Sequence, residues 1–530
     1  MNSNAFRRTL FTLLSMTVAS TASAGTITTW LGSGTNNNWT TSGNWSSTPS
    51  TSGTWSLIYS GTPTRTQSIN NVGSVKVDSI QFLNDGSFGK TSRFTLGGAA
   101  NTLTLTGSGS VTTATVSGTS LLDTISTNLS LQSLGTFNLG SNHNVLVTGT
   151  LNSAGTLVKT GAGVLYLQGA TTLSGLQIDQ GTVQFNNATA ATAIDGRVVQ
   201  IGSSGNTGSL LLNGVGTANS TASFKVRGNA IIAPTNFSNI TFTSSTFNVA
   251  DATITSPVIL SLGGGGLGNL GTETVNGAIV DNSATVTVGV TIGASANDTN
   301  VWVLKGNNTY TGDTTVSASA KLLMDGNVSA SSTTTSSGYL GGSGTFGGAV
   351  TISSGTLSPG GTSTSGGVIT DTIGTLTVGS LTLSNPSVTA MTITGSSAGQ
   401  YDQIVGSSTL DYGGGTLALT LSGSYADNTD FFLFTGFTSE LGQLSAITLS
   451  ANSPYSGLTF TRDVNGDWWT DWTAGHQQIL KFSESTGTLS VVPEPSTIVF
   501  AGIGMAMFGW STWTRRRAKA RRQAIEAAIA

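Results

Sequence analysis

Short runs in which apolar residues alternate with Thr or Ser constrain the fold of this chain more than any other feature. Examples are Thr102–Gly107 (TLTLTG), Val286–Gly293 (VTVGVTIG) and Thr375–Ser384 (TLTVGSLTLS), and Gly, Asn and Ser separate one run from the next. A period of two places alternate side chains on opposite faces of a strand, so each run predicts a strand with one buried face. Apolar residues at helical spacing are essentially confined to the two ends of the chain, and we expect an all-β fold.

The composition limits what can stabilise such strands. Only 8% of the 530 residues are charged, whereas about 25% is usual for a soluble domain. Cysteine is absent, and Gly is abundant at 71 residues. Disulfides and thiolate metal sites are therefore excluded. We expect stability to come from burial and backbone hydrogen bonds, beneath a surface of Thr, Ser, Asn and Gly.

Two segments repeat one pattern. Leu157–Phe185 and Trp302–Gly326 each place a strand before a Gly-bounded turn, then a connector of small residues, then another strand. Both closely resemble the autotransporter-associated β-strand repeat, and Gly338–Gly360 resembles the stretch that often follows such repeats. The residues that match the repeat pattern are Lys159, Thr160, Gly161, Gly163 and Leu165 in the first copy, and Asn308, Thr309, Tyr310, Thr311 and Gly312 in the second.

This resemblance implies a right-handed parallel β-helix, a solenoid in which every rung pairs its backbone with the rungs above and below. The residue types agree with it, since Val, Leu and Ile suit inward positions, Thr and Ser suit outward positions, and Gly and Asn suit tight corners. We predict the solenoid over residues 57–400, with about 20 residues per rung. Residues 401–492 have longer runs and clustered aromatics, and are predicted to form a compact C-terminal β-domain that closes the rod.

Residues 25–56 are rich in Trp and Asn and form a predicted N-terminal cap. Trp30, Trp39, Trp45 and Trp55 lie there among Gly, Asn and Thr. One interpretation is that these aromatics cover apolar surface at the end of the solenoid. The alternative is a row of platforms on which sugar rings stack, which makes the four residues candidate glycan contacts. The exposure of their side chains decides between the two.

Residues 1–24 have the order of a secretory signal peptide. Arg7 and Arg8 precede an apolar stretch, and Ala22, Ser23 and Ala24 then supply the small residues that a signal peptidase requires. We predict cleavage at this site, with Ala22 and Ala24 as the recognised residues, and export of the chain from about Gly25 onward.

A second uncharged segment lies near the C-terminus. No residue from Pro495 to Thr514 is charged, and these 20 positions would form a helix about 30 Å long, the thickness of a bilayer's hydrocarbon core. Arg515, Arg516 and Arg517 begin a basic cluster that should stay cytoplasmic, which leaves the rest of the chain outside. We therefore predict one C-terminal transmembrane helix.

Val492, Pro493, Glu494 and Pro495 (VPEP) immediately precede this segment. The order of this motif, a single span and an Arg cluster closely resembles the PEP-CTERM sorting signal of Gram-negative bacteria, over residues 493–530. The resemblance implies that an exosortase, a membrane protease, recognises the motif while the precursor is held transiently in the inner membrane, and then releases the body or transfers it to the cell surface. The tail Gln523–Ala530 extends past the basic cluster, where such signals usually stop.

The charge of the exported body excludes one class of partner. From Gly25 to Val492 the chain has 12 basic and 21 acidic residues, a net charge of −9. A nucleic-acid-binding protein needs a basic stripe that neutralises phosphates, so we expect no nucleic-acid partner.

One cluster of carboxylates suggests calcium. Asp463, Asp467 and Asp471, with Asn465, offer the oxygen ligands that hard cations prefer. However, an EF-hand loop needs Gly at its sixth place, and here Gly466 occupies the fourth. A hairpin turn around Asn465 and Gly466 explains the same residues, and we predict no metal site.

Catalytic residues do not group in the sequence. His143 and His476 lie far apart and outside any nucleophile motif. A polysaccharide lyase needs acidic metal ligands and a basic residue on one face of the rod, and Lys225 and Arg227 are the closest basic pair that shares a strand face. Lys159 already has a structural explanation as a repeat position. We predict that the chain is not an enzyme.

These observations predict an exported, non-enzymatic structural protein of the cell surface or of an extracellular biofilm matrix, without a cofactor. Its exterior of Thr, Ser and Asn would contact exopolysaccharide or other surface glycans. The alternatives are an adhesin or carbohydrate-binding protein and a β-helix polysaccharide lyase.

Overall fold

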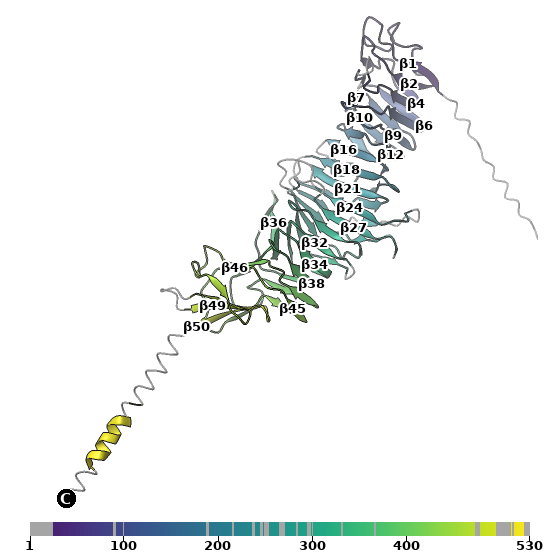
Figure 1. The fold of residues 1–530 in the computed structure, drawn as a ribbon. Coiled ribbons are helices and arrows are strands. Elements are labelled where there is room, and N and C mark those ends of the chain that lie inside the picture. The colour runs from purple at the N-terminus through teal and green to yellow at the C-terminus, as the bar shows by residue number, and fades with distance from the viewer. Residues whose placement is uncertain are drawn as a thin grey trace, which may run out of the picture.

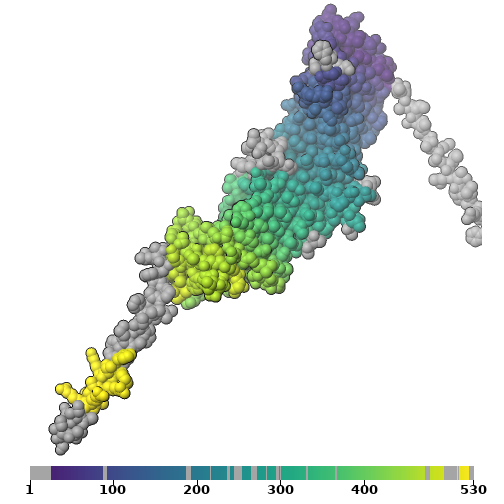
Figure 2. All heavy atoms as spheres, viewed as in Figure 1, coloured from purple at the N-terminus to yellow at the C-terminus, as the bar shows by residue number. Residues whose placement is uncertain are grey.

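The computed structural model of the protein describes residues 25–493, apart from gaps at 88–91, 99, 187–189, 215–216, 236–238, 244–246, 249–253, 264–270, 282, 284, 294–297, 299, 330–331, 365–366 and 472–477, and it describes residues 510 and 513–523. Strands dominate residues 25–493, and the short helix α1 (Ala190–Ala193) lies between two of them. Figures 1 and 2 show an elongated body with β1 (Thr26–Thr29) near one end and β50 (Thr488–Pro493) near the other. The prediction of a nearly all-β fold is confirmed.

Three long parallel sheets run along this body. The first contains β1, β2 (Thr54–Tyr59), β4 (Val75–Phe82), β6 (Thr102–Thr113), β8 (Asn128–Leu131), β9 (Gly135–Asn138), β11 (Leu151–Ser153), β12 (Thr156–Thr160), β14 (Thr171–Thr172), β15 (Gly175–Ile178), β17 (Val198–Ile201), β20 (Ser223–Val226), β23 (Phe247–Asn248) and β26 (Ile279–Val280). The third, which begins further along the chain, contains β19 (Thr217–Ser220), β22 (Asn239–Phe242), β25 (Thr272–Val275), β28 (Val301–Leu304), β30 (Lys321–Met324), β33 (Tyr339–Gly342), β35 (Thr356–Pro359), β39 (Val388–Ile393), β42 (Thr416–Leu421) and β46 (Ala446–Leu449).

The second sheet accompanies the other two along most of the body. It contains β3 (Gln67–Ile69), β5 (Thr95–Gly97), β7 (Leu121–Ile125), β10 (His143–Val147), β13 (Val164–Leu167), β16 (Gly181–Asn186), β18 (Thr207–Asn213), β21 (Asn229–Thr235), β24 (Val258–Leu262), β27 (Val288–Ile292), β29 (Thr314–Val316), β31 (Asn327–Val328), β32 (Thr334–Ser336), β34 (Thr345–Ile352), β38 (Thr375–Leu383), β40 (Gln403–Val405), β41 (Thr409–Asp411), β44 (Phe434–Thr435) and β45 (Ser439–Leu441). Such long parallel sheets are consistent with a β-solenoid.

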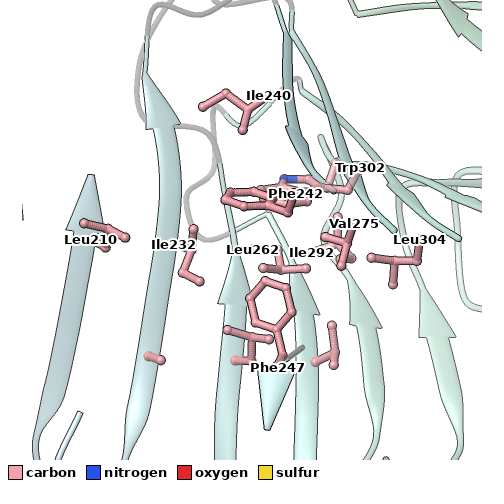
Figure 3. Close-up of a cluster of buried hydrophobic side chains, with 14 of the residues drawn as sticks. Leu210, Ile232, Ile240, Phe242, Phe247, Leu262, Val275, Ile292, Trp302 and Leu304 are labelled. Carbon is pink, nitrogen blue, oxygen red and sulfur yellow. The ribbon is translucent and has the colours of Figure 1, made fainter. Parts of the chain in front are cut away.

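The core lies between the sheets and is built from stacked columns of apolar side chains. Leu165 of β13 pairs in register with Val183 of β16, and both are fully buried. Further along, Ile232, Leu262 and Ile292 stack in the same way on β21, β24 and β27, and Figure 3 shows them inside the core. Because side chains alternate between the two faces of a strand, the intervening Thr and Ser residues face outward.

The rungs differ in length, whereas the sequence predicted a uniform length of about 20 residues per rung. Leu165 pairs with a residue 18 positions later, Val183, whereas Leu262 pairs with a residue 30 positions later, Ile292. The additional residues lie in connections outside the paired strands. Longer connections add little closure entropy, so the stacking tolerates them.

Parallel pairing also continues beyond the predicted boundary at residue 400. β42 pairs with both β39 and β46, and its sequence TLALTL has the same alternation as earlier rungs. The predicted boundary at residue 400 is therefore corrected. The clustered aromatics that suggested it begin earlier in the chain than the change from parallel to antiparallel strands. The direction changes in an antiparallel sheet of β43 (Asp430–Phe432), β47 (Phe460–Arg462), β48 (Asp467–Thr470), β49 (Gln478–Ser483) and β50, which we call the C-terminal cap.

Glu484 joins this cap to the last rungs. Its Oε1 accepts hydrogen bonds from Trp468 Nε1 at 2.9 Å and from the backbone N–H of Leu444 at 2.8 Å. Its Oε2 pairs with the guanidinium of Arg462 at 2.8 Å, and its backbone carbonyl accepts a hydrogen bond from the hydroxyl of Tyr412 at 3.0 Å. Leu444 and Tyr412 belong to the stack, so one residue fixes the cap against it.

A hairpin covers part of the outer face of the third sheet. Its strands β36 (Thr362–Thr364) and β37 (Val368–Thr370) pair antiparallel. Ile369 packs on an outward apolar group that includes Val301 and Leu323, and the ammonium of Lys321 donates a hydrogen bond to the carbonyl of Gly367 at 3.0 Å. Apolar residues on the outer face are thus sheltered here.

The two predicted targeting segments fall mostly outside the described residues. All of residues 1–24 and most of the predicted span, at 495–509 and 511–512, lie there. Among the helices that the structure describes, none combines the length and the apolar character needed to cross a membrane.

Glycines allow the rungs to approach closely at one corner. A Cβ atom added to Gly306 would lie 2.1 Å from the carbonyl oxygen of Gly277. Cβ atoms added to Gly326 and Gly344 would lie 2.2 Å and 2.1 Å from the carbonyl oxygens of Gly306 and Gly326. Each rung therefore contacts the backbone of the rung before it, where no other residue type fits.

We expect Gly326→Ala to destabilise the protein by about 1–3 kcal/mol, because the new methyl group would push two rungs apart. Thermal unfolding would show this as a lower midpoint. Gly423→Ala is the matched control, since its nearest neighbour would be the hydroxyl of Tyr425 at 3.8 Å, and its midpoint should change little. Equal midpoints for the two variants would contradict the steric explanation.

Candidate functional site

The four N-terminal tryptophans pack inward. Trp30, Trp39 and Trp45 are at most 5% exposed, and Trp55 is 9% exposed. Trp45 contacts Trp30 and Trp39 edge to face, with ring centroids 5.2 and 5.3 Å apart, and it also contacts Tyr59. The candidate glycan platforms are therefore absent from this end of the described structure. The cluster covers the end of the core instead, because its rings bury apolar area that the first rung would otherwise expose.

The indole nitrogens of this cluster also face the protein. Trp30 Nε1 donates a hydrogen bond to the carbonyl of Arg65 at 2.7 Å, and Trp39 Nε1 donates to the hydroxyl of Ser68 at 2.8 Å. These bonds join residues 25–56 to the following rung. Exposure could not be read from the sequence, because Trp is used both in cores and at binding surfaces.

The second sheet carries a continuous column of outward threonines. Register pairs connect Thr291 of β27 to Thr315, Thr335, Thr351 and Thr382 on four successive strands. Thr315 and Thr335 are exposed, and the other three are partly exposed. We call this column the threonine ladder, and parallel pairing spaces its members about 4.8 Å apart.

The adjacent serine column is used differently. Ser317 Oγ donates to the carbonyl of Gly293 at 2.9 Å, Ser337 Oγ to that of Val316 at 3.2 Å, and Ser353 Oγ to that of Ser336 at 3.0 Å. These hydroxyls connect consecutive rungs at the end of each strand. The side chains of the threonine ladder, by contrast, lie on the outward face of the sheet.

The calcium candidate is a hairpin turn. Asp463 Oδ1 accepts hydrogen bonds from the backbone N–H groups of Asn465 at 2.8 Å and Asp467 at 3.0 Å, and Gly466 adopts a positive φ of 91°. Asp471 Oδ1 accepts from the backbone N–H of Thr459 at 2.8 Å instead of facing this turn. These hydrogen bonds and the positive φ are those of a hairpin turn between β47 and β48.

His143 is buried in a pair that sequence reasoning missed. Its Nε2 lies 2.6 Å from Asp123 Oδ2, and its Nδ1–H donates to the carbonyl of Ala114 at 3.1 Å. Asp123 Oδ1 accepts a hydrogen bond from the backbone N–H of Phe94 at 2.6 Å. Both side chains are at most 1% exposed, so the pair holds neighbouring rungs together and offers no access to a substrate. The sequence signal that could have revealed this pair is the spacing of 20 residues between Asp123 and His143, which equals the predicted length of one rung.

The lyase candidates form no basic site. Arg227 Nη1 lies 3.6 Å from Asp179 Oδ1, in an ion pair that reaches across the intervening strand β17. Lys225 is partly exposed on β20, where its register partner is Gln200. His476 lies outside the described residues. Within the part of the chain that the structure describes, no group of three metal-ligating side chains lies beside Lys225 or Arg227.

The predicted sorting motif begins inside the C-terminal cap. Val492 and Pro493 are the last residues of β50 and pair in register with Ile479 and Gln478. Glu494 and Pro495 lie outside the described residues, as do the predicted signal-peptidase residues Ala22 and Ala24. The basic residues Arg515, Arg516 and Arg517 are exposed within helical residues 513–523.

Lys159 points into the solenoid although its side chain ends in an ionisable amine. Its Nζ donates hydrogen bonds to the carbonyls of Thr160 at 2.8 Å, Gly161 at 2.6 Å and Gln180 at 3.2 Å. These carbonyls lie at the corners of two successive rungs, so the repeat lysine ties one corner to the next. Burial lowers the pKa of Lys159 from its ordinary 10.5 to about 7.

This pKa shift predicts that the free energy of unfolding changes with pH in the neutral to alkaline range. Between about pH 7 and 10.5 the unfolded chain binds a proton at Lys159 that the folded chain has lost, so the free energy of unfolding should rise with pH across this window, by up to a few kcal/mol. Lys159→Met should flatten the rise, and Lys225→Met, on the outward face, should retain it. Urea midpoints at several pH values measure the slope, and an unchanged slope in Lys159→Met would contradict the assignment.

Comparison with known proteins agrees with the repeat prediction. A search of curated proteins finds no match. A family model described as the passenger-associated-transport-repeat matches residues 157–185 and 297–318. The first match coincides with the predicted copy Leu157–Phe185, which contains Lys159, and the second overlaps the predicted copy Trp302–Gly326. The chain therefore carries autotransporter-associated repeats, which indicate an exported, surface-related protein.

Proposed function

We propose that the chain is an exported, non-enzymatic structural protein of the cell surface or of the extracellular polysaccharide matrix. The observation that carries the proposal is the threonine ladder on a continuous parallel stack whose two ends are covered, by the tryptophan cluster at one end and by the C-terminal cap at the other. The matched repeats support export and a surface role.

The chemistry of the ladder suits a glycan chain. Each hydroxyl both donates and accepts a hydrogen bond, as the hydroxyls of a sugar do. Five hydroxyls in a line along the rod contact several residues of an extended polymer together, so that weak single contacts add. The methyl groups between them supply a little apolar surface for the sugar faces. Exopolysaccharide is therefore the proposed partner.

A structural role accounts for the buried polar groups better than catalysis does. His143, Asp123 and Lys159 each connect neighbouring rungs, and Arg227 is paired with Asp179. These residues are used by the fold. An adhesin remains an alternative only through a surface other than the N-terminal tryptophans, because those side chains are buried.

We further propose that the solenoid is right-handed, since about 98% of parallel crossover connections are right-handed.

For export, the proposed route begins with signal-peptide cleavage near Ala24 and a transient inner-membrane precursor held by residues 495–514. An exosortase would then act at the PEP-CTERM motif of a Gram-negative host. The position of Val492 and Pro493 at the last pairs of β50 supports this route, because Glu494 follows directly after the cap and processing there would leave the cap intact.

The ladder gives a direct test of the partner. We expect the triple variant Thr315→Val, Thr335→Val, Thr351→Val to lose at least about tenfold in affinity for the exopolysaccharide of its host, because valine keeps the shape and strand preference of threonine but has no hydroxyl. Co-sedimentation with the purified polymer measures the affinity.

The control carries three outward substitutions away from the ladder, Thr104→Val, Thr136→Val and Thr420→Val, and should bind as the parent does. Equal binding by the ladder variant and the parent would remove the ladder from the proposal. Cleavage of the polymer by the parent would overturn the non-enzymatic role.

The sorting route has its own test. Replacing Pro493, Glu494 and Pro495 with Ala leaves the uncharged segment unchanged, so insertion should persist while processing stops. In a host with an exosortase, the variant should stay at full length in the inner membrane, and the parent should be shortened and found outside it. Pro454→Ala, at an exposed proline between β46 and β47, should be processed normally. Identical processing of motif variant and parent would reject the sorting assignment.

A further inference from the structure

A carboxylate holds Gly25, the residue that directly precedes β1. The backbone nitrogen of Gly25 donates a hydrogen bond to Asp78 Oδ2 at 2.7 Å. The other oxygen, Asp78 Oδ1, accepts a hydrogen bond from Ser56 Oγ at 2.5 Å. Figure 1 shows β1, β2 and β4 together at this end of the body, and β2 pairs with both of the others. The carboxylate of β4 therefore reaches across β2 to the start of β1.

A bulge in β4 gives Asp78 this position. The register between β2 and β4 pairs Trp55 with Val77 and Ser56 with Ser79, so Asp78 has no partner on β2. The pairing of β4 with β6 passes over the same residue. Because a bulge re-aims the side chain of the additional residue, the carboxylate of Asp78 is not confined to the rows of the sheet.

The carboxylate lies directly against the backbone of Gly25. A Cβ atom added to Gly25 would lie 2.8 Å from Asp78 Oδ2 and 2.9 Å from Asp78 Oδ1. Asp78 forms no ion pair with a Lys or Arg side chain of the described residues, and the nearest basic residue on its strand, Lys76, is exposed. No side chain in this part of the structure thus neutralises the charge of Asp78.

We propose that Asp78 is the binding site for the N-terminal ammonium group that signal-peptide cleavage creates at Gly25, with Ser56 as a positioning residue. The inference rests on the export route proposed above. A signal peptidase hydrolyses the peptide bond between Ala24 and Gly25: the hydroxyl of water joins the carbonyl carbon of Ala24, and its hydrogen joins the nitrogen of Gly25. The new amine binds a further proton at neutral pH. The nitrogen that donates a neutral hydrogen bond to Asp78 then donates a charge-assisted one, which is stronger.

The ion pair fastens one end of the stack. β1 is the terminal strand of the first sheet and pairs with β2 alone, so it opens more easily than strands that are paired on both sides. In the precursor, only the neutral bond to Asp78 resists this opening. Cleavage adds the charge at the first residue of the mature chain, and the N-terminal end is therefore closed most firmly after processing.

Two chains that differ by one residue test the pair. One begins at Gly25 and the other at Ala24, both run to Ala530 in mild detergent, and only the first places its ammonium group at Asp78. Hydrogen exchange at the amides of β1 should be at least about fivefold slower in the chain that begins at Gly25, because the ion pair opposes local opening. Asp78→Asn keeps the size of the side chain without its charge, and should make the two chains exchange alike. Asp325→Asn, at an exposed acid far along the stack, should preserve the difference.

The position of the carboxylate has a separate test. Gly25→Ala places a methyl group where the carboxylate lies, so Asp78 must move away and a chain that begins at residue 25 should lose most of its slower exchange. In the host, mass spectrometry of the first peptide of the exported protein should identify Gly25 as its N-terminal residue.

The outcomes separate this inference from the export route. An exported protein that keeps residues 1–24 rejects both. An exported protein that begins at another residue, such as Ser23, leaves the route standing and overturns the assignment of Asp78. Equal exchange in the Gly25 and Ala24 chains, or a difference that persists in Asp78→Asn, overturns it as well. Should Asp78→Asn fail to fold, Ser56→Ala, which removes the second bond to the carboxylate and should reduce the difference, decides the question.

Discussion

The parallel hydrogen-bonded register between successive rungs is the constraint on which the rest of this structure depends. Once one strand pairs in register with the next, every inward residue lies on an inward residue and every outward residue lies on an outward one. The apolar column through Ile232, Leu262 and Ile292 and the outward column that begins at Thr291 follow from the same register. The placement of Glu273 against Trp302 does too, so one rule generates core, surface and buried acid.

A stack with open strand edges would recruit further strands, so its two ends need protection. The N-terminal end is closed by aromatic rings packed edge to face around Trp45. The C-terminal end is closed by antiparallel strands, and Glu484 fixes them through charged and neutral donors at once. The first closure relies on apolar area and the second on directed polar bonds. Both closures cover core surface at the ends of the stack, which suits a protein with few charges.

Period-two alternation was sufficient to predict the strands, because it depends on residues close in sequence. The parallel stacking was predicted from the resemblance of the two repeat copies to the autotransporter-associated β-strand repeat. The rung lengths were not predictable, since a connection can grow without disturbing the strands it joins. The partners of Glu273 and His143 are separated from them by about one rung, so their contacts appear only when the register is known. The N-terminal tryptophans show the same limit. The sequence shows where they are, but only their packing in the structure shows that they are buried.

The position of β50 has a mechanical consequence. It lies between β43 and β49 and ends at Pro493, where the chain leaves the cap. Tension on the following segment acts along the strand, so the hydrogen bonds to both neighbours are loaded in shear and must break together. Bonds at the edge of a sheet that is peeled open break one at a time. The cap therefore behaves as a clamp that isolates the stack from force applied to its C-terminal tail.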